Sequence, residues 1–157
     1  MTSKEIKIAY TEFTSLDELE SKDKELAQAA IDATAQAYAP YSKFNVGAAV
    51  LFEDGVIVKG SNQENAAYPS GLCAERTALF YASASRPDKA MVAISIAAVH
   101  NGELCETPAT PCGACRQVMA QYQLKSGLPM MVLLVGAHKI WKFDKVDDLL
   151  PLIFDSI

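Results

Sequence analysis

Three cysteines and one glutamate have the residue types and spacing of a metal site that performs chemistry. Cys73 and Glu75 frame a Cys-Ala-Glu sequence, and Cys112 and Cys115 stand three residues apart after Pro111. Three thiolates can bind Zn²⁺ and leave its fourth position to a water, which the metal makes acidic near neutral pH. The pattern predicts one zinc ion held by the three cysteines, with Glu75 placed to move that water's protons.

Both cysteine motifs are expected where the chain enters a helix. Cys112 and Cys115 can share one face of a first helical turn, with Pro111 at its first position. Cys73 follows a turn-like Tyr-Pro-Ser-Gly stretch and precedes a helical run that reaches about Ser83. The positive end of a helix lowers the pKa of a thiol, and this favours metal ligation.

Positive charge is needed beside this cluster, because the three negative charges of the thiolates exceed the two positive charges of the ion. The net negative charge would make the bound water a poor acid. Arg76 and Arg116 directly follow the two motifs. We expect Arg76 to lie against the metal ligands and Arg116 to be a charge that flanks its helix.

A structural zinc site in an interaction module without activity is the alternative from another functional class. Cys105 is the fourth cysteine, and four sulfur ligands would leave no position for water. It lies near an Asn-Gly turn, well before the helix that follows Pro111, so a free thiol is expected. His100 and His138 are expected in solvated loops and accompany no serine or cysteine motif, which argues against a Ser/His or Cys/His nucleophile.

Beyond the metal motifs, the sequence resembles the zinc-dependent cytidine deaminases, specifically the small, three-cysteine, homotetrameric type that acts on free nucleosides. The resemblance leaves out only about the first dozen residues. It runs through residues 38–42, 44–49, 62–69, 73–78 and 111–118 and ends at 149–151. It implies hydrolysis of cytidine and deoxycytidine to uridine and deoxyuridine plus ammonia, as in pyrimidine salvage, with one zinc ion per subunit.

The resemblance also implies roles for individual residues. Glu75 would take a proton from the water, pass it to the pyrimidine ring nitrogen and later protonate the departing ammonia. Phe44 would pack against the base, and the backbone of Ala74 would meet the base edge. Asn62 and Glu64 would bind the ribose, and no residue is dedicated to a 2′-hydroxyl, so ribose and deoxyribose both stay open.

The same resemblance implies a homotetramer whose subunits complete one another's sites. Residues that match Ala66, Tyr68 and Phe154 come from neighbouring subunits in the tetrameric members. Residues 152 and 153 are Leu and Ile, where small polar residues are expected before that phenylalanine. Antibiotic-inactivating or modified-cytosine deaminases are the alternative within zinc chemistry. The blasticidin type lacks the ribose-reading stretch of residues 62–65, so its presence favours a cytosine nucleoside.

The composition fits a small, uncharged substrate. The chain has 157 residues, 50% of them hydrophobic, which suits one deaminase-like domain over residues 1–157 with an N-terminal extension at 1–14. No bilayer-spanning run or signal-peptide pattern is found, so a soluble cytoplasmic protein is expected, without a membrane partner. The net charge of −5 and the lack of clustered Lys and Arg argue against nucleic acid as a partner.

The expected elements form a three-layer α/β/α, deaminase-like fold with a mixed five-stranded sheet and helices on both faces. An Ala-rich helix, re-started near residues 21–23 after a capping box at Ser15 to Glu18, is expected to reach about Tyr38. Strands are expected at 46–52, 56–61, 91–99, 130–135 and 140–143, and a last helical turn at 146–150. Alternating Ile6, Ile8 and Tyr10 give a weak strand signal over residues 4–10, for which an extended arm is the alternative. The metal motifs and Asn62 are expected to meet in one cleft at the sheet edge.

Overall fold

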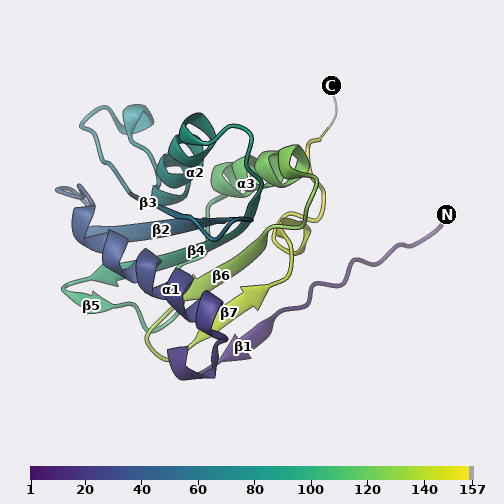
Figure 1. The fold of residues 1–157 in the computed structure, drawn as a ribbon, viewed down its shortest axis with the longest axis horizontal. Helices are drawn as coiled ribbons and strands as arrows, with labels where there is room; N and C mark the ends of the chain where they lie inside the picture. The colour runs from purple at the N-terminus through teal and green to yellow at the C-terminus, as the bar shows by residue number, and fades with distance from the viewer. Residues whose placement is uncertain (156–157) are drawn as a thin grey trace.

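The computed structural model describes residues 1–155, which form one mixed sheet with helices against both of its faces (Figure 1). The three-layer α/β/α architecture expected from the sequence is confirmed. Within these residues the helices are α1 (Ser21–Ala33), α2 (Ala74–Ser85) and α3 (Gly113–Ser126). The strands are β1 (Thr11–Phe13), β2 (Phe44–Phe52), β3 (Ile57–Ser61), β4 (Met91–His100), β5 (Glu103–Leu104), β6 (Met131–Val135) and β7 (Ile140–Phe143).

The sheet has seven strands in the described part of the chain, so the expected number of five is wrong. Its order is β1-β7-β6-β4-β2-β3, with β5 paired to β4. The five expected strands are present as β2, β3, β4, β6 and β7. The other two, β1 and β5, are three and two residues long, which is too short for an alternating sequence pattern to reveal them.

The start of the chain also differs from expectation. Residues 1–10 have no regular secondary structure, and the strand begins at Thr11, where β7 lies alongside it. The expected capping box at Ser15 is replaced by two bonds from Thr14, whose N and Oγ1 donate to the Glu18 carboxylate over 3.0 and 2.7 Å. The first helix ends at Ala33 and continues only as a 3₁₀ turn, Thr34–Gln36, so it stops short of Tyr38.

The central strand β4 separates two apolar cores. Its Ile94 and Ile96 belong to the core shared with α2 and α3, whereas Ala93 and Ala97 belong to the core shared with α1. This is the alternation of a strand that is buried on both faces. Strand β6 pairs parallel to β4 because α3 carries the chain back between them, and the other pairings are antiparallel.

Two glycines let helices approach the sheet closely. A Cβ at Gly47 on β2 would overlap the backbone of Ala30 in α1, and a Cβ at Gly60 on β3 would overlap the backbone of Ala78 in α2. Only glycine allows such approach without displacing the helix. The second contact matters for the site, because it fixes α2, whose first turn carries the Cys-Ala-Glu motif. Within residues 1–155, no helix combines the length and apolar character that a bilayer crossing requires.

Candidate active site

Three cysteine sulfurs converge between the starts of α2 and α3. Among residues 1–155, the group able to hold a metal consists of Cys73, Cys112 and Cys115, whose sulfurs all lie within 4.8 Å of one another. The last two sulfurs are 3.5 Å apart. A tetrahedral zinc with bonds of about 2.3 Å to sulfur holds its thiolates about 3.8 Å apart, so the group fits this ion. Cys105 is not a member of the group, and the expectation of a three-sulfur site is confirmed.

The helix starts place these sulfurs. Cys73 is the N-cap of α2, and Cys112 is the N-cap of α3, each with extended backbone angles and without a side-chain capping bond. Their sulfurs are therefore free to turn toward each other. Cys115 follows in the first turn of α3 and is buried. Pro111 precedes the N-cap and does not occupy the first helical position, which corrects the sequence interpretation by two residues.

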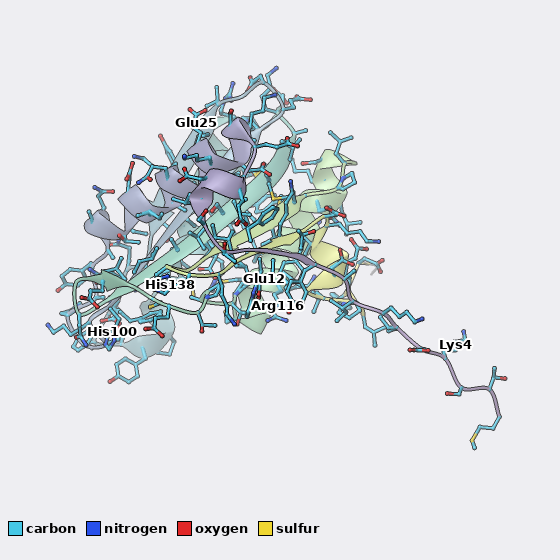
Figure 2. All side chains as sticks on the ribbon, turned by 90° about the horizontal axis from the view of Figure 1, so that it is seen from below. Lys4, Glu12, Glu25, His100, Arg116 and His138 are labelled. Atoms are coloured by element: carbon cyan, nitrogen blue, oxygen red, sulfur yellow. The ribbon has the colours of Figure 1, made fainter. Side chains whose placement is uncertain are left out.

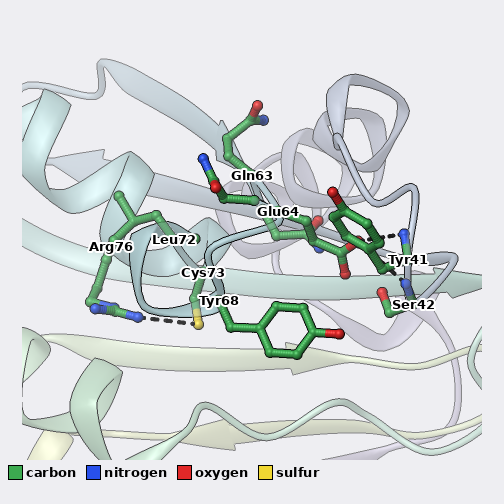
Figure 3. Close-up of a pocket in the computed structure, with 11 residues that line it drawn as sticks. Tyr41, Ser42, Gln63, Glu64, Tyr68, Leu72, Cys73 and Arg76 are labelled. Atoms are coloured by element: carbon green, nitrogen blue, oxygen red, sulfur yellow. Dashed lines mark hydrogen bonds between the residues drawn. The ribbon is translucent and has the colours of Figure 1, made fainter.

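Arg76 lies against the sulfur cluster, as predicted. Its Nη2 is 3.6 Å from the sulfur of Cys73 (Figure 3). A hydrogen bond from Cys115, followed by the Arg76 guanidinium, lowers the pKa of Cys73 to about 5, although burial acts in the other direction. The same hydrogen bond and burial raise the pKa of Cys115. Without a metal, the lowered pKa of Cys73 and the raised pKa of Cys115 favour negative charge on Cys73, and a bound cation would favour ionisation of Cys115 as well.

Glu75 is a buried carboxyl group beside the sulfurs. It lies in the first turn of α2 with 5% of its surface exposed. Burial raises its pKa, and the negative charge on Cys73 acts in the same direction. A bound cation would favour the ionised carboxylate. A carboxyl group whose pKa lies above its ordinary value is suited to take up and release a proton, as a general acid and base must.

A cavity of about 460 Å³ opens beside the cluster. This volume lies in the range of small-molecule sites. The cavity collects the predicted residues Phe44, Asn62, Glu64, Cys73, Ala74, Glu75 and Cys112. Residues not singled out from the sequence complete its wall: Ser42, Val46, Ile96, Ala109 and Thr110. Two of the three cysteines and the proposed ribose-binding side chains thus line one cavity, as expected from the sequence.

A second cavity of about 580 Å³ adjoins the first and shares Ser42, Asn62, Glu64 and Cys73 with it. Arg76 lines it at one end and Tyr41 and Ser42 at the other, with Tyr68 between them (Figure 3). Of these two cavities, the smaller one is lined by the sulfur-bearing Cys73 and Cys112 and by the buried carboxyl group of Glu75, whereas the larger one has only Cys73 of these three. We therefore assign the reaction to the smaller cavity and treat the larger one as its approach.

The sequence matches the model of a known protein family. Residues 20–130 match the family model described as the cytidine and deoxycytidylate deaminase zinc-binding region. The chain belongs to the cytidine deaminase family. Its predicted cofactor, zinc, is the metal named in that description, and the three-cysteine group is suited to hold it.

Individual members of the cytidine deaminase family are similar over much of the chain. The cytidine deaminase of Halalkalibacterium halodurans is 52% identical over 97 residues, which are 61% of this chain and 68% of the relative. That of Sporosarcina psychrophila is 51% identical over 87 residues, 55% of this chain and 60% of the relative. The crystal structure of the Burkholderia pseudomallei cytidine deaminase superposes with a TM-score of 0.67 and 39% identity, and covers 83% of this chain and 97% of its own.

Asn62 hydrogen-bonds to the start of β2 in this family member. Its Oδ1 accepts from the backbone N–H of Val46 over 2.8 Å, and its Nδ2 donates to the carbonyl of Phe44 over 2.9 Å. One N–H of the amide is left to face the cavity. Asn62 therefore also fixes the backbone that carries Phe44.

Glu64 holds the loop before β2 in a similar way. Its Oε2 accepts from the backbone N–H groups of Tyr41 (2.8 Å) and Ser42 (3.3 Å). Hydrogen bonds from Ser42 come first among the causes that lower the pKa of Glu64. The side chain is thus an ionised acceptor. Both of these backbone hydrogen bonds go to Oε2, and neither uses Oε1. Together with Asn62, Glu64 presents two polar groups that are held in place before any ligand arrives.

The residues predicted to reach a neighbouring subunit are exposed in the single chain. Tyr68 is 79% exposed and lines the second cavity, with its ring 6.3 Å from that of Tyr41. Phe154 is 68% exposed, and its backbone is bound to the side chain of Gln117. Ala66 is exposed as well. Neither Ala66 nor Phe154 lines either of the two cavities beside the sulfur cluster, so their expected role in a site remains a prediction.

Sequence reasoning missed the part played by two residues. Arg116 is not a solvated flanking charge, because its Nε donates to the carbonyl of Pro111 (2.8 Å) and its Nη1 to that of Leu149 (2.9 Å). It ties the metal-binding helix start to the C-terminal turn. His100 is not in a loop but ends β4, opposite Phe44, with ring centroids 6.0 Å apart. The place of Arg116 directly after Cys115 in the sequence could have indicated its role, whereas no feature of the sequence indicated that His100 would end a strand.

Proposed function

We propose that this protein is a zinc-dependent hydrolase that converts cytidine and deoxycytidine to uridine and deoxyuridine and releases ammonia, as in pyrimidine salvage. One observation carries the proposal: the same 460 Å³ cavity is lined by two members of the metal group, by the buried Glu75 and by the polar pair Asn62 and Glu64. The relatives named cytidine deaminase support the reaction. A site with metal chemistry but no nucleoside-binding groups would lack that polar pair.

Cys73, Cys112 and Cys115 would hold the zinc ion, and Arg76 would offset the excess negative charge of their sulfurs. When bound, zinc acidifies a water molecule and so provides the nucleophile for the amino-bearing carbon of the base. The short distance from Arg76 to the Cys73 sulfur, 3.6 Å, supports this role for the guanidinium.

Glu75 would carry the protons of the reaction. Its carboxylate takes one proton from the water and delivers it to the neighbouring ring nitrogen, which prepares the carbon for attack. A second transfer protonates the amino group, the carbon–nitrogen bond breaks, and ammonia leaves as the carbonyl of uridine forms. The consumed water thus supplies the uridine oxygen and the additional hydrogen of ammonia. Burial of Glu75, which raises its pKa, supports a group that alternates between the two protonation states.

The nucleoside would lie with its base on Phe44 and the backbone of Ala74, and its sugar against Asn62 and Glu64. Oε2 of Glu64 is occupied by backbone N–H groups, so Oε1 would accept from a sugar hydroxyl. The negative charge of Glu64 disfavours a phosphate on the sugar. This supports free nucleosides, not nucleotides or nucleic acid strands, as substrates.

We infer that the active form is a homotetramer in the cytoplasm. The exposure of Tyr68 and Phe154, and of the α2 side chains Phe80 (43%) and Tyr81 (62%), supports burial against other subunits. The four cysteines, none of which forms a disulfide within residues 1–155, support a reducing compartment. Sedimentation of the zinc-loaded protein would show the number of subunits.

The direct test mixes purified, zinc-assayed protein with cytidine and measures uridine and ammonia. We expect both products in equal amounts, with deoxycytidine also accepted and cytidine monophosphate turned over far more slowly. Removal of zinc by a chelator should abolish the reaction, and added zinc should restore it. Turnover of blasticidin without turnover of cytidine would contradict the proposal and favour an antibiotic-inactivating deaminase.

A further inference from the structure

Residues 1–10 leave the body of the molecule as an extended arm. Figure 1 shows the arm running outward from β1, and Figure 2 shows Lys4 far from the packed domain. Its apolar side chains are unusually open to solvent: Ile6 is 57%, Ile8 54% and Tyr10 52% exposed. Alternate apolar residues on an extended chain are the pattern of a strand that has one face to bury.

The arm continues the line of β1. That strand is the first in the sheet order, and it pairs with β7 from Thr11 to Phe13. Tyr10 still reaches the sheet, with its ring 5.6 Å from Trp141 and 5.2 Å from Phe143. Because β7 ends at Phe143, the arm before Tyr10 has no residue of β7 beside it. Ile6 and Ile8 fall on the same face as Tyr10, since strand side chains alternate.

The outer edge of β1 is also without a neighbouring strand in the described part of the chain, since β1 stands at the end of the sheet order. An open edge presents backbone N–H and C=O groups that can pair with another strand. The arm and β1 together therefore offer one continuous edge, with an apolar face formed by Ile6, Ile8 and Tyr10.

We propose that residues 4–12 pair antiparallel with the same residues of a second copy of this chain, about a two-fold axis at Ile8. In this register Ile8 lies opposite Ile8 of the partner subunit, and Ile6 lies opposite Tyr10 of the partner subunit. Lys4 lies opposite Glu12 of the partner subunit at both ends. Three kinds of favourable cross-strand pair then share one face. The contact is self-complementary, as a two-fold interface requires.

The neighbouring registers are less favourable. A shift by two residues in one direction places Lys7 opposite Lys7 of the partner subunit, which sets like charges against each other. A shift in the other direction places Ile6 opposite Glu12 of the partner subunit. A shift by one residue would set the apolar face of one arm against the polar face of the other. The sequence thus selects one pairing.

Glu12 is held ready for this contact. Its Oε2 accepts a hydrogen bond from Nε1 of Trp141 over 2.7 Å. This bond fixes the carboxylate beside the outer strand and leaves Oε1 to accept from Lys4 of the partner subunit. The complementary charges at the two ends of the apolar segment favour a second copy over an unrelated apolar partner.

Hydrogen exchange of the full-length, zinc-loaded protein tests the pairing. We expect amides in residues 4–10 to exchange at least about tenfold more slowly in the wild type than in Ile8→Glu, because pairing with a second copy protects them. Ile8→Glu puts two like charges on the axis and should abolish this protection. Thr2→Glu adds the same charge outside the paired segment and should retain it. Unprotected arms in the wild type, or equal protection in the wild type and Ile8→Glu, would overturn the proposal.

Disulfide trapping tests the register. Residues directly opposite in antiparallel strands have Cα atoms about 4.5–5.5 Å apart, within the range that a disulfide can bridge. Mild oxidation of Ile8→Cys should therefore give a covalent dimer on a non-reducing gel. Ala9→Cys should not, because Ala9 lies opposite Lys7 of the partner subunit, and the wild type controls for its own cysteines. Equal trapping of both variants, or of neither, would refute the two-fold axis at Ile8.

Discussion

The guanidinium of Arg76 lies 3.6 Å from the sulfur of Cys73, three residues earlier in the chain. This contact joins the metal-ligand group to a permanent positive charge that lies in the same first turn of α2. Arg76 Nε is buried and has no hydrogen-bond partner within residues 1–155, so the side chain is held by the sulfur contact and not by a carboxylate. Its charge is therefore available to the cluster.

Arg76→Gln should retain the fold but lose activity. The variant removes the charge that offsets three thiolates, and loss of such a group costs typically about 10- to 100-fold in metal affinity or activity. Zinc content and kcat for cytidine would be measured together. Arg86→Gln is the matched control, because it removes the same charge from a surface pair with Asp54. Equal activity of the two variants would show that Arg76 has no special role.

Substitution of the cysteines should separate ligands from the free thiol. Cys73→Ala, Cys112→Ala and Cys115→Ala should each lose zinc and turnover, because each removes one of three converging sulfurs. Cys105→Ala should keep both. Metal analysis after dialysis gives the answer without an activity assay. Loss of zinc from the Cys105 variant would indicate a four-sulfur structural site instead.

Glu75→Gln should isolate the proton transfers. The amide keeps the size of the side chain but cannot act as a base, so kcat should fall by at least about 10²–10⁴-fold. Zinc and nucleoside binding should survive, since Phe44 and Glu64 are unchanged, and KM should move little. Calorimetric titration with uridine would check binding in the same sample. A zinc-loaded variant with near wild-type turnover would make Glu75 a mere structural residue.

Ser95→Ala should leave stability unchanged or raise it. The Ser95 hydroxyl is fully buried in β4 and has no hydrogen-bond partner within residues 1–155. Its removal therefore relieves the cost of burying an unpaired polar group, which is about 1–3 kcal/mol. Ser61→Ala is the matched control, because that hydroxyl accepts from Gln63 Nε2 over 3.2 Å and its loss should destabilise. Urea unfolding of the zinc-loaded proteins compares the two.

The surface pair of Asp54 and Arg86 should make stability depend on acidity. Hydrogen bonds from Arg86 lower the pKa of Asp54 from 3.8 to about 2. A carboxyl group whose pKa is lower in the folded than in the unfolded state stabilises the fold at pH values above its unfolded pKa. This contribution to stability fades as the pH falls from about 3.8 toward 2. Asp54→Asn should therefore be less stable than the wild type near neutral pH, and the difference in unfolding free energy should vanish near pH 2. A constant difference across this range would exclude the linkage.

The metal group could be predicted from the sequence because its determinants are local. A cysteine at a helix start needs only its immediate neighbours to be recognised, as at Cys73 and Cys112. The other wall of the cavity could not be predicted, because Ile96 and Thr110 reach it only through the packing of β4 and the chain that follows β5. The roles of Asn62, Glu64 and the exposed Tyr68 stay predictions until variants are assayed.

Long-range contacts explain the remaining differences. The carbonyl partner of Arg116 lies 33 residues further along the chain, and the partner of Trp141 Nε1 lies 129 residues away at Glu12. No periodicity within a short window carries such information. The very short strands β1 and β5 are likewise defined only by the strands beside them, as the pairing of Thr11 with Lys142 shows for β1.

The hydrogen bond from Arg116 to Leu149 has a consequence for how the protein matures. Chains emerge from the ribosome with the N-terminus first, and Cys73 therefore appears long before the turn that contains Leu149. The helix start that carries Cys112 and Cys115 therefore gains its contact with Leu149 only after all three cysteines have been made. We expect a chain that ends before Leu149 to hold zinc less tightly than the full chain, because this contact is missing from it.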